Sequence, residues 1–219
     1  MTDKSAVKLK EGIAYYDISP EITENTAVFP GDVAYSRRVS LDFEKGDALL
    51  LSSVESTLHL GAHVDSPGHY NRAGAGIEAR NLNYYMGPCQ VITVDLPRGE
   101  RVYPKDISSQ AIETQRVLFR TRSFPNPNSW NGDFNSLSAQ LVDDLASKGV
   151  VLVGIDTPSI DPAEDKALEA HQAVYKNNLA VLEGIVLDAV PDGVYKLIAL
   201  PLRLKGADAS PVRAILCKE

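Results

Sequence analysis

Three of the four histidines in this chain fall within eleven residues, between His59 and His69, in the segment HLGAHVDSPGH. An aspartate, Asp65, stands two positions after the middle histidine, His63. Imidazole nitrogens and carboxylate oxygens are the ligands that zinc and related divalent metals prefer. The segment therefore predicts a metal site, and the simpler alternative is a polar loop with three unrelated histidines. Metal binding is favoured because isolated histidines rarely come with a carboxylate at the same two-residue spacing.

The glycines and the proline of this segment make a continuous helix unfavourable, which excludes the helical H-E-x-x-H type of metal motif. We expect instead a strand that runs into a bend. Alternate side chains of a strand face the same way, so one face would carry His59, Gly61, His63 and Asp65. Because Gly61 has no side chain, it would leave room for an ion between the two imidazoles.

Length and composition are those of a globular chain with a substantial core. At 219 residues, 44% hydrophobic and 23% charged, we expect one domain over residues 1–219. The net charge of −7 argues against nucleic acid or an anionic membrane as a partner, because both require a basic surface. No apolar run reaches about 18 residues, and the N-terminus lacks the apolar core of a signal peptide. Cys89 and Cys217 stand apart in apolar stretches, as reduced thiols do in a cytoplasmic protein.

Apolar and alternating runs, interrupted by a few helical patterns, predict an α/β fold with a mixed sheet. Strands are expected at residues 13–18, 35–43, 48–58, 89–96, 116–121, 150–155, 179–185, 195–204 and 212–216. Helices are expected at 104–114, from Ser136 or Ser138 to 148, and at 163–176. The strands at 35–43 and 48–58 should form a pair that leads into the histidine segment.

A long loop is expected at residues 122–135, which are rich in Asn, Pro and Ser and include the only tryptophan, Trp130. Ordered loops of this length usually serve a function, here as a lid or as a dimer contact. The sequence does not choose between these two roles.

The fourth histidine, His171, lies on the last predicted helix, where a lone histidine is more often a packing or surface residue than a ligand. Two observations favour a ligand. The first histidine pair and Asp65 fill only one open site, so a second ion would need further ligands. Glu183 stands in a predicted apolar strand, where a carboxylate is costly to bury unless it is paired or binds a metal.

Segments along nearly the whole chain resemble the bacterial kynurenine formamidase family, in the cyclase-like group of metal hydrolases. They are YDISP at 16–20, VFPGD at 28–32, HLGAHVDSPGHY at 59–70, VLFRT at 117–121, GIDTPSIDP at 154–162, His171, LEG at 182–184 and PLRLKGADASPVRAIL at 201–216. The histidine motif alone would indicate only the wider group, which includes isatin hydrolase. Gly68, where relatives often have leucine, departs from the family pattern beside the site.

The resemblance implies a barrel-like mixed sheet and two zinc ions per subunit, with manganese as the alternative metal. His59, His63 and Asp65 would bind the first ion, and Asp65 would bridge to the second, which His171 and Glu183 complete. His69 would be the general acid/base, with a third metal ligand as the alternative role. The resemblance also implies a homodimer.

The implied reaction is hydrolysis of N-formyl-L-kynurenine to L-kynurenine and formate. Tyr16 would face the substrate ring, at a position where the family usually has tryptophan. Two rival functions stay open: opening of a cyclic amide such as isatin on the same fold, and metal binding without catalysis.

Overall fold

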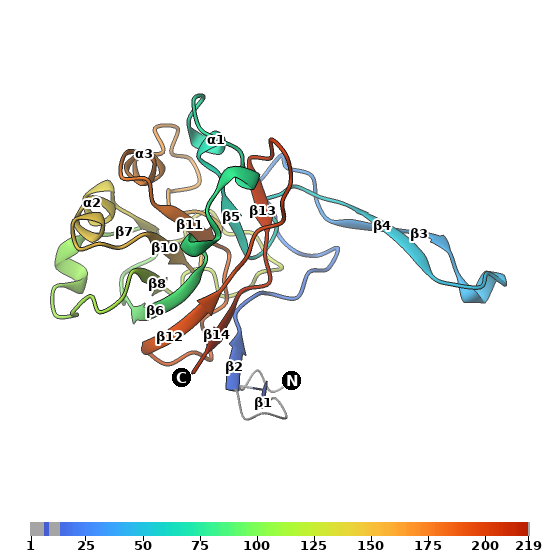
Figure 1. Cartoon of the computed structure of the whole chain (residues 1–219), viewed down its shortest axis with the longest axis horizontal. Helices are drawn as coiled ribbons and strands as arrows, with labels where there is room; N and C mark the ends of the chain where they lie inside the picture. Colours follow the sequence, from blue (N-terminus) through green and yellow to red (C-terminus); the bar gives the residue numbers. More distant parts are fainter. Residues whose placement is uncertain (1–6, 9–13, 219) are drawn as a thin grey trace.

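The computed structural model describes residues 7–8 and 14–218, and one mixed sheet runs through them (Figure 1). Ten strands in the described residues form this sheet, in the order β1-β2-β14-β12-β6-β8-β10-β11-β5-β13. The sheet curls into part of a barrel, and a few helices flank it. The α/β class and the barrel-like mixed sheet expected from the sequence are therefore confirmed.

The centre of the sheet is parallel and buried. It consists of β6 (Met86–Thr93), β8 (Arg116–Arg120), β10 (Leu152–Ile155) and β11 (Ala180–Glu183). Every residue of β8, β10 and β11 is buried, as expected of largely apolar strands covered on both faces. The carboxyl ends of these strands lead into the loops that surround the site.

Antiparallel strands extend the parallel centre on both sides. One side carries β5 (His63–Asp65) and β13 (Ala209–Pro211). The other side carries β12 (Gly193–Ile198), β14 (Ile215–Cys217), β2 (Ala14–Asp17) and β1 (Val7–Lys8). The strand β5 is short, but it carries two of the predicted metal ligands into the interior.

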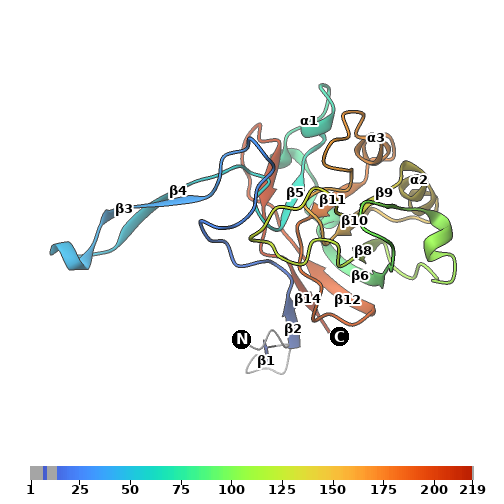
Figure 2. The same ribbon diagram turned by 180° about the vertical axis from the view of Figure 1, so that it is seen from behind.

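Helices α2 (Ala139–Ser147) and α3 (Glu169–Lys176) pack side by side against one face of the parallel strands (Figures 1 and 2). Ser138 begins α2 as its N-cap, because its hydroxyl accepts a hydrogen bond from the backbone N–H of Leu141 at 3.1 Å. The remaining elements are short. They are α1 (Pro67–Tyr70), η2 (Ile77–Ala79), η3 (Leu82–Tyr84), η4 (Pro104–Ile107) and the small parallel pair β7 (Arg101–Val102) and β9 (Ser136–Leu137).

A two-stranded arm projects from the body of the molecule (Figures 1 and 2). It is formed by β3 (Ser36–Leu41) and β4 (Leu51–Glu55), with the short helix η1 (Phe43–Lys45) at its tip. The expected strand pair is thus confirmed, but it lies outside the main sheet. All residues of β4 are exposed, and the arm displays several apolar side chains: Phe43, Leu49, Leu50, Leu51 and Val54.

Several predicted boundaries are wrong. The helix expected at 104–114 is only the single turn η4, because the amide of Gln90 holds the chain beyond it in an irregular path, bonding Ala111 O and Glu113 N. The helix expected at 163–176 begins only at Glu169, after Leu168 adopts a left-handed conformation with φ of 50°. The strand expected at 195–204 ends at Ile198, and β13 was not predicted.

Within the described part of the chain, none of the helices combines the length and the apolar character needed to cross a membrane.

Candidate metal centre

Five predicted ligands converge in two groups that share Asp65. The outer group consists of His59, His63 and Asp65, and the inner group of Asp65, His171 and Glu183. Within each group, one nitrogen or oxygen atom from every residue lies within 4.8 Å of the others. Segments far apart in the sequence therefore present one set of metal-type donors at one place.

The two carboxylate oxygens of Asp65 face different histidines. Oδ1 lies 3.0 Å from His59 Nδ1 and 3.6 Å from His63 Nε2, whereas Oδ2 lies 3.4 Å from His171 Nε2. Glu183 completes the arrangement, with Oε2 at 3.2 Å from His63 Nε2 and Oε1 at 3.4 Å from His171 Nε2. Each oxygen of Asp65 thus faces a different group of donors.

The expected continuous strand from His59 to Asp65 is wrong. Strand β5 begins only at His63, because Gly61 adopts a left-handed conformation with φ of 55°. The turn at Gly61, rather than a period of two, brings His59 next to Asp65. The predicted bend after Asp65 includes one helical turn, α1, with Pro67 at its first position.

Close contact between two glycines brings the strands of the site together. A Cβ atom at Gly184, whose φ is 65°, would lie 2.0 Å from the carbonyl oxygen of Gly61. No side chain fits at position 184, so the backbones touch there. As a result Glu183, the preceding residue, sits opposite His63 in the pairing of β11 with β5.

Hydrogen bonds made by the Nδ1 atoms of His63 and His171 orient the Nε2 atoms of both rings toward the carboxylates of Asp65 and Glu183. His63 Nδ1 donates to the carbonyl of Gly61 at 2.9 Å, and His171 Nδ1 bonds the carboxylate of Asp161 at 2.8 Å. The Nε2 atoms of both rings and both oxygens of Asp65 are buried and have no hydrogen-bond partner among the described residues. Buried donors and acceptors are rarely left unpaired, so these atoms fit divalent metal ions.

The charge of the site also favours a cation. Burial alone would lower the pKa of His59, but the carboxylate of Asp65 beside its ring, assisted by Asp208, raises it to about 9. Burial likewise opposes a charged His171, yet its bond to Asp161 and the nearby carboxylates of Asp65 and Glu183 hold its pKa well above the ordinary value. The carboxylates thus stabilise positive charge at the points where the imidazoles meet them.

Asp161 supports the inner group by binding the second ring nitrogen of His171, and it was not predicted from the sequence. Its carboxylate is fully buried, and it also accepts hydrogen bonds from the backbone N–H groups of Ala170 and His171 at 3.0 Å. The guanidinium of Arg101 donates a further hydrogen bond to Asp161 Oδ1 at 2.8 Å. The GIDTPSIDP segment contains this aspartate, but nothing in its spacing connects it with a histidine ten residues later.

His69 lies on α1 at the solvent side of the outer group, with its ring centroid 4.2 Å from that of His59. Burial lowers the pKa of His69, and the nearby His59 and His171 act in the same direction against the carboxylates of Asp65 and Glu183. Asp208, a second residue that sequence reasoning missed, lies 3.0 Å from His59 Nε2 and 3.8 Å from His69 Nδ1. The three side chains form a further cluster of metal-type donors, although Asp208 and His69 are exposed.

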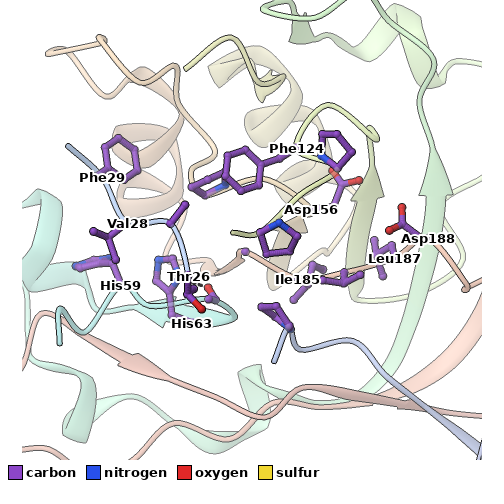
Figure 3. Close-up of a pocket in the computed structure, with 18 of the residues that line it drawn as sticks. Thr26, Val28, Phe29, His59, His63, Phe124, Asp156, Ile185, Leu187 and Asp188 are labelled. Atoms are coloured by element: carbon purple, nitrogen blue, oxygen red, sulfur yellow. Dashed lines mark hydrogen bonds between the residues drawn. The ribbon is translucent and has the colours of Figure 1, made fainter. Parts of the chain in front are cut away.

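A pocket opens beside His59 and His63 (Figure 3). Its walls are largely apolar and include Phe29 and the loop residues Phe124, Pro125 and Pro127. The loop predicted at 122–135 therefore forms part of the cavity wall. The apolar and aromatic lining suits a small organic molecule with an aromatic ring.

Tyr16 is not brought to this cavity. It lies on β2, where its ring packs edge-on against Tyr195 at 5.8 Å and lies beneath the ammonium of Lys218 at 5.6 Å. The residues that line the cavity do not include Tyr16. The aromatic side chains other than histidine that line the cavity are instead Phe29 and Phe124.

Residues 16–162 match the family described as putative cyclase, a span of more than half of the chain. This chain belongs to the putative cyclase family. Relatives of this cyclase-family protein include the kynurenine formamidase of Maricaulis maris, 40% identical over 92% of this chain and 96% of the relative. The kynurenine formamidase of Polaromonas naphthalenivorans is 46% identical over 92% of this chain and 89% of its own length.

Solved structures agree with this assignment. A potential metal-dependent hydrolase with cyclase activity superposes with a TM-score of 0.81 at 26% identity, covering 95% of this cyclase-family chain and 99% of its own. Isatin hydrolase A from Labrenzia aggregata has a TM-score of 0.79 at 18% identity, covering 94% and 93%. The second likeness is one of fold alone. The protein is accordingly a metal-binding hydrolase.

Proposed function

We propose that this protein hydrolyses N-formyl-L-kynurenine to L-kynurenine and formate, as an arylformamidase of tryptophan degradation. The observation that carries the proposal is the convergence of five metal-type donors, His59, His63, Asp65, His171 and Glu183, of which His59 and His63 line an apolar cavity. Kynurenine formamidases that are 40–46% identical over 92% of the chain support the choice of substrate.

Two divalent ions, zinc or alternatively manganese, would occupy the outer and inner groups. The support for two ions is that Asp65 directs one carboxylate oxygen to each group. Bound there, the metals would polarise the formyl carbonyl and make a water molecule a stronger nucleophile. The protein contributes the fixed directions of the donors, since His63 and His171 are held through their second nitrogens.

His69 would move the protons of the reaction. An anilide nitrogen is a poor leaving group as an anion, so it must receive a proton when the C–N bond breaks. Burial lowers the pKa of His69, which favours the neutral imidazole that can accept a proton from water before passing it to the nitrogen. Its side chain is 35% exposed, at the solvent side of the ligands.

We also propose a cytoplasmic homodimer. The support for the dimer is the projecting arm, because an isolated two-stranded hairpin is marginally stable in water. Its apolar residue Val54 is 65% exposed. Burying this surface against a second copy would stabilise the arm.

One assay tests the function: zinc-loaded protein is incubated with N-formylkynurenine, and formate and kynurenine are measured. Equal amounts of both products, lost after a chelator and restored by zinc, are expected. Opening of isatin without formate release from formylkynurenine would assign the rival cyclic-amide reaction instead. Two bound metals without turnover of either compound would indicate a binding protein.

Sedimentation tests the assembly separately. We expect twice the 23.8 kDa chain mass at micromolar concentration. Val54→Glu should shift the protein toward the monomer, whereas Ser53→Glu, on the opposite face of the same strand, should have less effect. A wild-type monomer at that concentration would contradict the proposal.

A further inference from the structure

The cavity has two chemically different ends. His59 and His63 lie at one end, and Asp156 and Asp188 lie at the other (Figure 3). Apart from the histidines, the charged residues of the lining are Arg122, Asp156 and Asp188, and nearly all other lining residues are apolar. A ligand whose reactive group reaches the histidines would therefore meet one cationic and two anionic side chains with its opposite end.

Arg122 is held in an unusual backbone conformation. Its φ is 58°, which a residue with a side chain seldom adopts because of the clash between Cβ and the backbone. The carboxylate of Asp156 stabilises this turn by accepting the N–H of Arg122 at 2.8 Å and the N–H and hydroxyl of Thr121 at 2.9 and 2.7 Å. Asp156 thus has its hydrogen-bonding capacity taken up by the backbone, and it serves to fix Arg122 at the cavity wall.

The side chains of Arg122 and Asp188 remain available. Both residues are exposed and both line the cavity. Neither side chain forms an ion pair or a hydrogen bond with any other residue in 7–8 and 14–218. A guanidinium binds a carboxylate through two parallel hydrogen bonds, and a carboxylate binds an ammonium group.

We propose that Arg122 and Asp188 bind the α-amino-acid end of the substrate, Arg122 the α-carboxylate and Asp188 the α-ammonium. This inference rests on the proposed function, because it concerns the part of formylkynurenine opposite the formamide. With the formyl group at the metal ligands, the ring lies along the apolar wall of Phe29 and Phe124. The amino-acid end then reaches the charged end of the cavity. Arg122 and Asp188 therefore decide which aryl formamides bind well.

The test compares two substrates: N-formyl-L-kynurenine and 2′-formamidoacetophenone, which keeps the aryl formamide and the ketone but lacks the amino-acid group. Arg122→Gln and Asp188→Asn should each raise the KM for formylkynurenine about 10- to 100-fold, the usual effect of a lost charge-assisted hydrogen bond. The kcat should change little, since the contact is made in ground and transition state alike. The KM for the truncated compound should stay within about twofold of wild type.

Three controls sharpen the comparison. Arg122→Lys keeps the charge but loses the two parallel bonds, so its KM should lie between those of wild type and Arg122→Gln. Lys148→Gln removes an exposed charge on the solvent side of the molecule, where Lys148 pairs with Asp144, and should change neither KM. Thermal melting of every variant verifies folding.

Equal losses on both substrates, or no loss on either, would overturn the assignment of Arg122 and Asp188 while leaving the arylformamidase function intact. A wild-type enzyme with a higher kcat/KM for the truncated compound would do the same. If the zinc-loaded wild type hydrolyses neither compound, the proposed function itself fails, and this inference falls with it.

Discussion

The inner and outer ligand groups share Asp65 but differ in their surroundings. Every residue of the inner group is buried, and a further layer supports it: Asp161 holds His171, and the backbone N–H of Ile160 bonds Glu183 at 2.6 Å. In the outer group, His59 has a side chain that is 14% exposed, and it faces the cavity, His69 and the exposed Asp208.

This difference indicates that metals bound in the two groups would have different roles. A metal in the inner group would be enclosed by protein atoms and held by oriented ligands, which suits tight binding and electrostatic support. A metal in the outer group would meet substrate and water directly, because the open side of the site lies there. Substitutions in each group, and at the supporting carboxylates Asp161 and Asp208, can test whether the two groups have different roles.

The largest effect is expected for Asp65→Ala, because Asp65 is the residue that both groups share. We expect loss of both ions and a fall in turnover of more than about 100-fold, which is the upper range for residues that only support a ligand. Metal content by mass spectrometry and kinetics on formylkynurenine measure the two effects. His171→Ala is the matched variant and should chiefly empty the inner group. Full occupancy in Asp65→Ala would refute the shared-ligand arrangement.

His69→Ala should affect only the open side of the site. Because His69 is proposed to move protons rather than to bind metal, both ions should remain while kcat falls about 10²–10⁴-fold. Metal content and turnover are measured on the same preparation. A loss of metal that parallels the loss of activity would make His69 a ligand instead.

Two supporting carboxylates provide a matched comparison of the groups. Asp161→Asn should weaken metal affinity about 10- to 100-fold, because it disturbs a buried bond that orients His171. Asp208→Asn should cost less than about tenfold, because the side chain of Asp208 is 51% exposed and water can replace it. Competition with a metal-binding dye gives both affinities. An equal or larger effect of Asp208→Asn would remove the distinction between inner and outer groups.

The smallest effect is expected at Tyr16. Since its ring packs against Tyr195 rather than into the cavity, Tyr16→Leu should leave the KM for formylkynurenine unchanged within about twofold. Phe124→Leu, at the cavity wall, should raise KM about two- to twelvefold through loss of aromatic stacking. If Tyr16→Leu raises KM as much as Phe124→Leu does, Tyr16 contacts the substrate as its family resemblance implies.

The sequence indicated the donors of the site better than their arrangement. The histidine segment and the buried position of Glu183 follow from residue type and local pattern, and the strongly apolar strands β8, β10 and β11 were recognisable for the same reason. Asp208 was not recognisable as part of the site, because it lies 149 positions along the sequence from His59, which it contacts. Such a contact depends on the pairing of β13 with β5, and no local pattern encodes that pairing.

Local backbone conformation explains the other differences. The positive φ values of Gly61 and Leu168 ended a predicted strand and shortened a predicted helix. Glycine permits such values but does not demand them, and leucine seldom adopts them. These conformations are imposed by long-range contacts, so they became visible only in the folded chain.

The contact between Gly61 and Gly184 has a consequence for how the protein acquires its metals during synthesis. More than half of the chain separates these two glycines, and contacts of such long range close late because the entropy cost of forming the loop comes first. A nascent chain that has emerged only through the histidine segment carries neither His171 nor Glu183. It can hold no ion in the inner group, so a fully loaded site marks a chain that has been synthesised and folded at least as far as β11.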